Sequence, residues 1–210
     1  MQEVLVRIEL GDSWGALQVV DRMRGPSLRT VTRIPEGPVM FDWMSARAPA
    51  VVALDLHTAG PIAERSYDRM LETGMHAVRT PFAHLLGVLR TLEGDLGAGI
   101  HLLREAEGLP GIWRDSFLPV ILADLAIALV RAGDLDGAAA AIDRTASGAV
   151  SASQQGRVRL AEAELLEARG DAEGAVALAR SVAARAREHG ALVEEWDLSL
   201  IHISEPTRPY

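Results

Sequence analysis

Apolar side chains recur along most of this chain with the spacing of α-helices. Ile121, Leu122, Leu125, Ala126 and Leu129 fall on one face of a helix, because they follow the i, i+1, i+4, i+5, i+8 rule. The same spacing returns in the segment 172–189. No segment shows sustained alternation of apolar and polar residues between turn signals, which is the pattern of strands. The pattern therefore predicts an all-α protein with essentially no sheet.

Glycine-centred turns divide this helical pattern into hairpins. They are Gly11-Asp12, Gly94-Asp95, Gly133-Asp134 and Gly170-Asp171, with Gly60-Pro61 as a degenerate fifth turn. Glycine ends a helix in the left-handed conformation without a Cβ penalty. The aspartate that follows can cap the next helix, and its charge suits the positive end of the helix dipole. Successive turn glycines are 34 to 49 residues apart, a period typical of stacked helix pairs.

Small residues flank these turns at fixed distances. Seven residues before each turn glycine stand Val4, Ala53, Gly87, Ala126 and Ala163. Five residues after it stand Ala16, Arg65, Gly99, Ala138 and Ala175. Two antiparallel helices approach closely only where both carry small side chains, so this pairing is what a helical hairpin needs. Arg65 breaks the rule, which makes the second hairpin the least regular.

We expect one helical-repeat domain over residues 1–197. Its hairpins are predicted near 2–23, 41–73, 81–107, 113–145 and 155–189. The turn of the second hairpin is placed at Gly60. A Gly-, Pro- and Arg-rich loop over 24–38 separates the first two hairpins.

The last residues read differently from the rest. Residues 198–208 look like the in-frame translation of a transposase-type sequencing adapter, and we expect 198–210 to be an artefactual tail. The natural sequence would then reach only to about Asp197, and a following domain would be missing. The chain also starts inside a helical pattern, which would be explained by a truncated start. Deletion of 198–210 should leave the melting temperature almost unchanged.

Composition excludes several functions. The net charge of −8 argues against a nucleic-acid surface. All 21 basic residues are arginine, so a Walker A lysine and a Schiff-base lysine are impossible. Cysteine is absent, which removes disulfides and thiolate metal ligands. The sequence contains no window of about 18 uninterrupted apolar residues, so no membrane span is expected. A cytoplasmic setting fits best.

No residue pattern predicts a catalytic, cofactor or metal site. The segment Gly94–Gly99 has a passing likeness to a phosphate loop, but it follows a helix and lacks lysine. The turn aspartates would be a full layer apart, so N-caps are the better interpretation. Five of the six histidines precede residue 198, and they show no metal-ligand spacing: His57, His76, His84, His101 and His189. One local basic cluster could contact an acidic partner or a neighbouring domain, but a solvated long loop is the favoured interpretation: Arg22, Arg24, Arg29 and Arg33.

The fragments around three turns carry a family resemblance. Leu-Leu-Gly-Val-Leu-Arg-Thr-Leu-Glu-Gly-Asp at 85–95, Leu-Ala-Ile-Ala-Leu-Val-Arg-Ala-Gly-Asp at 125–134 and Ala-Glu-Leu-Leu-Glu-Ala-Arg-Gly-Asp at 163–171 resemble tetratricopeptide-like repeats. More narrowly, this Ala/Arg-rich style is similar to the repeat region of large actinobacterial LuxR/MalT-type ATP-dependent transcriptional regulators. The resemblance implies a right-handed superhelix of about five hairpins and a non-enzymatic sensor segment. A generic peptide-binding adaptor and an accessory region of a signalling enzyme are the alternatives.

In such repeats the first helix of each hairpin lines a concave groove. Counting back from the turn glycines gives the candidate partner groove: His84, Val88, Thr91, Val120, Ala123, Ile127, Val130, Arg157, Leu160 and Glu164. An exposed apolar groove of this kind marks a binding surface. The partner would be a protein, a peptide or a small effector; alternatively, another domain or further repeats of the same protein cover the groove. No cofactor is expected.

Overall fold

The computed structural model describes residues 56–74, 79–110, 114–145 and 152–189, together with Gly15, Gln18, Val19 and Arg22. Within these residues the chain forms helices and no strands, so the predicted all-α class is confirmed for them. The helices are α5 (Leu56–Thr73), α6 (Arg79–Leu92), α7 (Leu96–Gly108), α8 (Arg114–Arg131), α9 (Leu135–Thr145), α10 (Ala152–Ala168) and α11 (Ala172–His189). Apart from Gly15, Gln18, Val19 and Arg22, the expected hairpin over 2–23 lies outside the described residues. The first part of the hairpin 41–73, the loop 24–38 and the tail 198–210 lie outside them as well.

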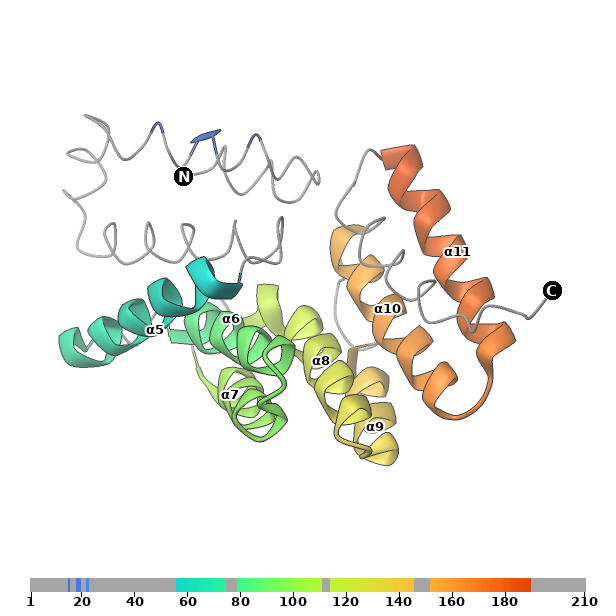
Figure 1. Ribbon diagram of the computed structural model, residues 1–210, viewed down its shortest axis with the longest axis horizontal. Helices are drawn as coiled ribbons and strands as arrows, with labels where there is room; N and C mark the ends of the chain where they lie inside the picture. Colours follow the sequence, from blue (N-terminus) through green and yellow to red (C-terminus); the bar gives the residue numbers. More distant parts are fainter. Residues whose placement is uncertain are drawn as a thin grey trace.

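Six of these helices form three antiparallel hairpins that follow one another in chain order (Figure 1). α6 packs on α7, α8 on α9, and α10 on α11. We call the pair α6–α7 the first hairpin, α8–α9 the central or middle hairpin, and α10–α11 the third hairpin. The first helix of the middle pair, α8, lies between the other two pairs, because it contacts α7 and α6 on one side and α10 on the other. α5 precedes the three hairpins and packs on α6. The first helices therefore form a row in the order α6, α8, α10.

Each hairpin turn is built by a Gly-Asp pair, as the sequence predicts. Gly94, Gly133 and Gly170 have φ of 88°, 83° and 88°, the left-handed region that favours glycine. In the middle turn the Gly133 N–H donates to the Val130 carbonyl and the Asp134 N–H to the Leu129 carbonyl, both at 2.9 Å. The other two turns repeat this pair of hydrogen bonds. This arrangement is the Schellman motif, which satisfies the last carbonyls of a helix.

The aspartate of each pair then caps the helix that follows. The Asp134 carboxylate accepts a hydrogen bond from the Gly137 N–H at 2.9 Å, and the Asp171 carboxylate accepts one from Gly174 at 2.9 Å. Asp95 accepts one from Ala98 at 3.1 Å. A side-chain acceptor at this position satisfies one of the unpaired N–H groups of the first turn. The predicted N-caps are confirmed, and one dipeptide serves two helices.

The small-residue rule is confirmed in the three described hairpins. Its six members there are all buried: Gly87, Gly99, Ala126, Ala138, Ala163 and Ala175. In the first hairpin a Cβ on Gly87 would lie 3.2 Å from the Gly99 carbonyl oxygen. The two helices are therefore in backbone contact at this point, which explains why glycine occupies both positions.

The turn predicted at Gly60-Pro61 is wrong. α5 continues through both residues, with Pro61 exposed on its surface and Gly60 buried. A Cβ on Gly60 would lie 3.3 Å from a Glu93 carboxylate oxygen, so this glycine permits close packing rather than a turn. Pro61 removes only one backbone donor from the second turn of the helix. The glycine that ends α5 is Gly74, with φ of 67°.

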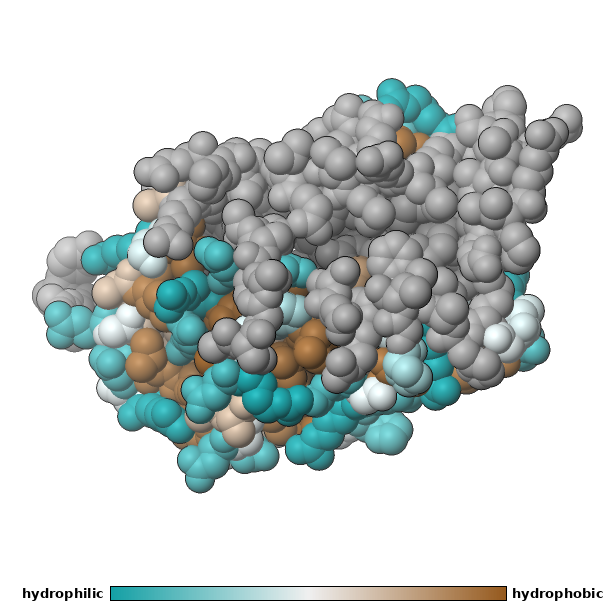
Figure 2. Space-filling model, turned by 180° about the vertical axis from the view of Figure 1, so that it is seen from behind, coloured by the Kyte–Doolittle hydropathy of each residue, from teal (hydrophilic) through white to brown (hydrophobic). Residues whose placement is uncertain are grey.

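A continuous apolar core joins the hairpins. It reaches from Leu103 in α7 to Val182 in α11 and includes Ile127 and Leu160 of the central first helices. Leu71 is the one large apolar side chain classed as exposed among the described residues. On the face shown in Figure 2, hydrophobic residues are visible between hydrophilic ones. None of the described helices has the length and apolar character that crossing a bilayer requires.

Candidate functional site

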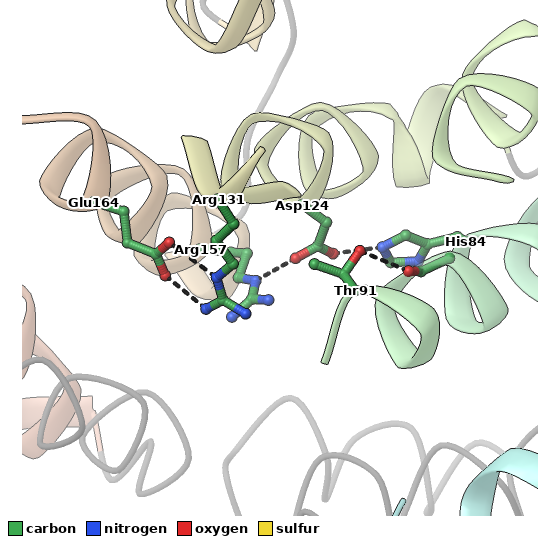
Figure 3. A network of polar contacts seen from close by, with 7 residues as sticks. His84, Thr91, Asp124, Arg131, Arg157 and Glu164 are labelled. Carbon is green, nitrogen blue, oxygen red and sulfur yellow. Dashed lines mark hydrogen bonds and ion pairs between the residues drawn. The ribbon is translucent and has the colours of Figure 1, made fainter. Parts of the chain in front are cut away.

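A chain of polar side chains crosses the row of first helices (Figure 3). His84 comes from α6, Asp124 from α8 and Arg157 from α10. The His84 Nε2 lies 2.6 Å from Asp124 Oδ2, and the Arg157 Nε donates to Asp124 Oδ1 at 2.5 Å. Each oxygen of one carboxylate therefore binds a residue of a different hairpin. We call His84, Asp124 and Arg157 the relay.

The Asp124 carboxylate is ionised although it is buried. Its side chain is 5% exposed, and burial alone would raise its pKa. The charge of Arg157 and the hydrogen bond from His84 outweigh burial and lower the pKa of Asp124 to about 2. An ionised carboxylate only accepts hydrogen bonds, so the Nε2 of His84 carries the hydrogen in this contact.

The second nitrogen of the His84 ring is unusual. Nδ1 is buried and has no hydrogen-bond partner among the described residues. The ring also meets Phe117 edge to face, with centroids 6.1 Å apart. A buried polar atom without a partner has a free-energy cost. The relay thus holds His84 by one nitrogen only.

A second ion pair crosses from α8 to α10 beside the relay. The Arg131 Nη2 lies 3.1 Å from Glu164 Oε1, and its Nε donates to Glu164 Oε2 at 3.4 Å. The Arg131 side chain is 40% exposed, so the pair adds little stability, on the order of 1 kcal/mol or less. Thr91 does not take part in this ion pair. Its hydroxyl donates a hydrogen bond to the Gly87 carbonyl of its own helix at 2.9 Å.

Ionic contacts also tie the second helices and α5 to their neighbours. Arg144 of α9 pairs with Glu107 of α7. Tyr67 of α5 donates to Glu105 of α7 at 2.5 Å, and Arg79 of α6 binds the same carboxylate at 2.6 Å. Burial and the hydrogen bond to Glu105 raise the pKa of Tyr67, while Arg79 lowers it. These contacts join α5, α6 and α9 to α7.

The structure places the predicted groove residues on the row of first helices but does not expose them as an apolar surface. Five are buried, namely His84, Thr91, Ala123, Ile127 and Leu160. The other five are partly buried, namely Val88, Val120, Val130, Arg157 and Glu164. The expected exposure is therefore wrong for Ala123, Ile127 and Leu160, which belong to the core cluster. These apolar side chains are taken up by contacts between hairpins. Binding of a partner along this row stays a prediction.

The other candidate residues of the sequence analysis either have an ordinary structural role or lie outside the residues that the structure describes. The segment Gly94–Gly99 is the first hairpin turn and the start of α7. His57 and His101 are exposed on helices. The side chains of His76 and His189, and the arginines at 24, 29 and 33, lie outside the described residues. No group of three metal-ligating side chains gathers among the residues that the structure describes.

Sequence reasoning missed Asp124, the centre of the relay. A signal was present, because Asp124 interrupts the apolar run from Ile121 to Leu125. Nine residues before the turn glycine, the neighbouring hairpins carry Leu85 and Ala161, and both are buried. An acid at a position that the repeat otherwise fills with apolar side chains indicates a special role.

The relay has the composition of a His–Asp pair, but its geometry favours a structural role. His84 is 4% exposed. The hydroxyl of Thr91 on the same helix donates to the Gly87 carbonyl and not to His84. A general base must reach the proton that it removes from a substrate. The arrangement can hold helices in register and present Arg157 and Arg131 at the edge of the row.

Comparison with known proteins adds no relative. No family model, no curated protein and no solved structure matches the chain.

Proposed function

We propose that this chain is a non-catalytic helical-repeat scaffold that binds a protein, a peptide or a small effector along the row α6, α8, α10. The observation that carries the proposal is the repetition of one hairpin design three times in succession, with the same Gly-Asp turn and the same pair of small residues. Stacked hairpins of this kind produce extended binding surfaces. In a right-handed superhelix of tetratricopeptide type, this row would line the concave side.

The binding surface in this proposal consists of the partly buried members of the row. Val88, Val120 and Val130 supply apolar area, and Arg157 and Glu164 supply charge beside it. Most of the affinity for a helical or extended peptide would come from such apolar anchors, and the charges would select its orientation. Ile127 is not a member of this surface, since it is 3% exposed.

Peptide display tests the proposal. The intact chain is immobilised and used to select from a random peptide library, and the selected peptides are measured against variants. Val120→Glu should reduce binding at least tenfold, because it introduces a charge on the first helix of the central hairpin. Ala140→Glu is the matched control, since Ala140 is exposed on the second helix of the same hairpin. Both variants should retain helical circular dichroism. Equal binding by both would reject this surface.

On the sequence resemblance, we also propose that the scaffold is the sensor segment of a cytoplasmic LuxR/MalT-like regulator. In that setting, a change in hairpin stacking would be passed to an output domain. The flanking gene sequence decides between this context and a free-standing adaptor. A Walker A motif upstream and a helix-turn-helix downstream would support the regulator, whereas a cyclase or kinase domain would contradict both.

A further inference from the structure

We infer that Asp124 couples the first and third hairpins energetically, so that a change at His84 is felt at Arg157 although the two residues belong to separate hairpins. The biological meaning of this coupling rests on the proposed scaffold function. A sensor needs coupling between hairpins to pass a binding event along the stack.

The first argument is geometric. The two oxygens of Asp124 are divided between neighbours, with His84 of α6 on Oδ2 and Arg157 of α10 on Oδ1. A carboxylate is rigid, so moving one oxygen moves the other. A displacement of α6 relative to α8 therefore disturbs the contact between α8 and α10. The exposed pair Arg131–Glu164 lacks this property, because it joins only α8 and α10.

The second argument is electrostatic. Arg157 is the main charge that keeps the buried Asp124 ionised. Without it, burial favours the neutral acid. Protonation of Asp124 would change the hydrogen bond from His84 from a charge-assisted bond to an ordinary one, which is about half as strong. The contribution of His84 to stability thus depends on Arg157, and by reciprocity the contribution of Arg157 depends on His84.

The third argument comes from the repeat itself. A buried acid with charged partners is often replaceable by apolar side chains without loss of stability. The equivalent positions hold Leu85 and Ala161, so the repeat has an apolar solution available and does not use it in the central hairpin. The Nδ1 of His84, which has no hydrogen-bond partner within the described part of the chain, supports the same conclusion, since a relay built for stability alone would pair it. Coupling is a property that an apolar contact at this position would not provide.

A double-mutant cycle in the full chain tests the inference. His84→Leu and Arg157→Met are made singly and together, and the equilibrium constant of unfolding is measured in denaturant at neutral pH. Each variant raises this constant by some factor. We expect the factor for the double variant to be about five times smaller than the product of the two single-variant factors. A shortfall above twofold supports the coupling, and agreement with the product within twofold overturns it.

Two controls locate the coupling. His84→Leu combined with Arg131→Met should be additive, because these residues share no carboxylate. The original cycle repeated in an Asp124→Leu background, which copies Leu85, should also be additive. Persistent coupling in that background would overturn the role of Asp124. Should the double variant be unfolded, His84→Gln with Arg157→Lys gives a milder cycle with the same expected sign, and its additivity would overturn the inference equally.

Hydrogen exchange gives a local readout. Arg157→Met, made on α10, should speed amide exchange in α6, whereas Arg131→Met on α8 should leave α6 unchanged. Equal exchange in α6 for the two variants would contradict the coupling. These measurements use no ligand, so their outcome is separate from that of the peptide selection.

Discussion

Gly87 and Gly99 face each other across the first hairpin so closely that neither position has room for a methyl group. A Cβ on Gly87 would meet the Leu103 Cγ at 2.8 Å and the Leu103 backbone nitrogen at 3.1 Å. A Cβ on Gly99 would meet the Thr91 hydroxyl at 2.4 Å and the Thr91 backbone nitrogen at 3.0 Å. The spacing between α6 and α7 is therefore set by backbone contact rather than by side chains.

Gly87→Ala should accordingly destabilise the protein by about 1–3 kcal/mol, the usual cost of overpacking. Backbone atoms form part of the obstacle, so a rotamer change cannot relieve it. The free energy of unfolding from denaturant titration measures the effect. Gly108→Ala is the control, because a Cβ there meets nothing within 4 Å. A neutral result for Gly87→Ala would show that the helices separate without cost.

Gly133→Ala tests conformation rather than space. A Cβ at Gly133 would also meet nothing within 4 Å, but its φ is 83°. The left-handed conformation costs an L-residue about 1–2 kcal/mol. We expect a loss of that size in thermal or denaturant unfolding. Gly133→Asn should cost less, because asparagine tolerates this region better. Equal losses for alanine and asparagine would point to a different cause.

Asp134→Ala removes the cap of α9 and should cost about 0.5–2 kcal/mol. The loss arises because the Gly137 N–H, which donates to Asp134 at 2.9 Å, is left without its acceptor. Asp134→Asn should retain most of the stability, since asparagine caps as well as aspartate. Asp136→Ala is the comparison, because Asp136 carries the same charge in the first turn of α9. A similar loss for Asp136→Ala would assign the effect to charge rather than to capping.

Asp124 should give the protein an acid-dependent term in its stability. Burial raises its pKa, but Arg157 and His84 lower it overall, from 3.8 to about 2. A group with a depressed folded pKa contributes stability above its unfolded pKa. That contribution is lost as the pH falls from about 4 through about 2, and it is on the order of 2 kcal/mol. Unfolding titrations across this range measure it.

Asp124→Asn is the matched variant for that titration. It keeps the shape of the side chain and removes the titrating group, so the slope of stability against pH between 4 and 2 should decrease. At neutral pH the variant should be less stable, because the relay loses its charge-assisted bonds. An unchanged slope would mean that other carboxylates account for the acid sensitivity.

The hairpins were predictable because their signals are local. Gly133 and Asp134 determine one turn by backbone conformation and capping, and neither effect depends on the rest of the fold. The hairpin ends expected near 145 and 189 are confirmed, because α9 ends at Thr145 and α11 at His189. The Gly60 turn was wrong because Gly60 and Pro61 favour a break in isolation, whereas close packing near Glu93 uses the same glycine inside a helix.

The site was less predictable because it depends on contacts between hairpins. His84 and Arg157 were identified by register, but nothing local shows that Asp124 joins them over sequence separations of 40 and 33 residues. The exposure of Ile127 was misjudged for the same reason. Whether a side chain on a first helix faces solvent or a neighbouring hairpin depends on how the hairpins stack, which the turn spacing does not determine.

The shared Gly-Asp turn has a consequence for how such a chain can change during evolution. Because one dipeptide ends the first helix and starts the second, an insertion inside a hairpin disrupts two helices at once. Insertions between hairpins, around 110–114 and 146–151, leave every turn whole. Gene duplication or recombination with breakpoints there transfers complete hairpins, so scaffolds of this design can gain or lose length by whole hairpins.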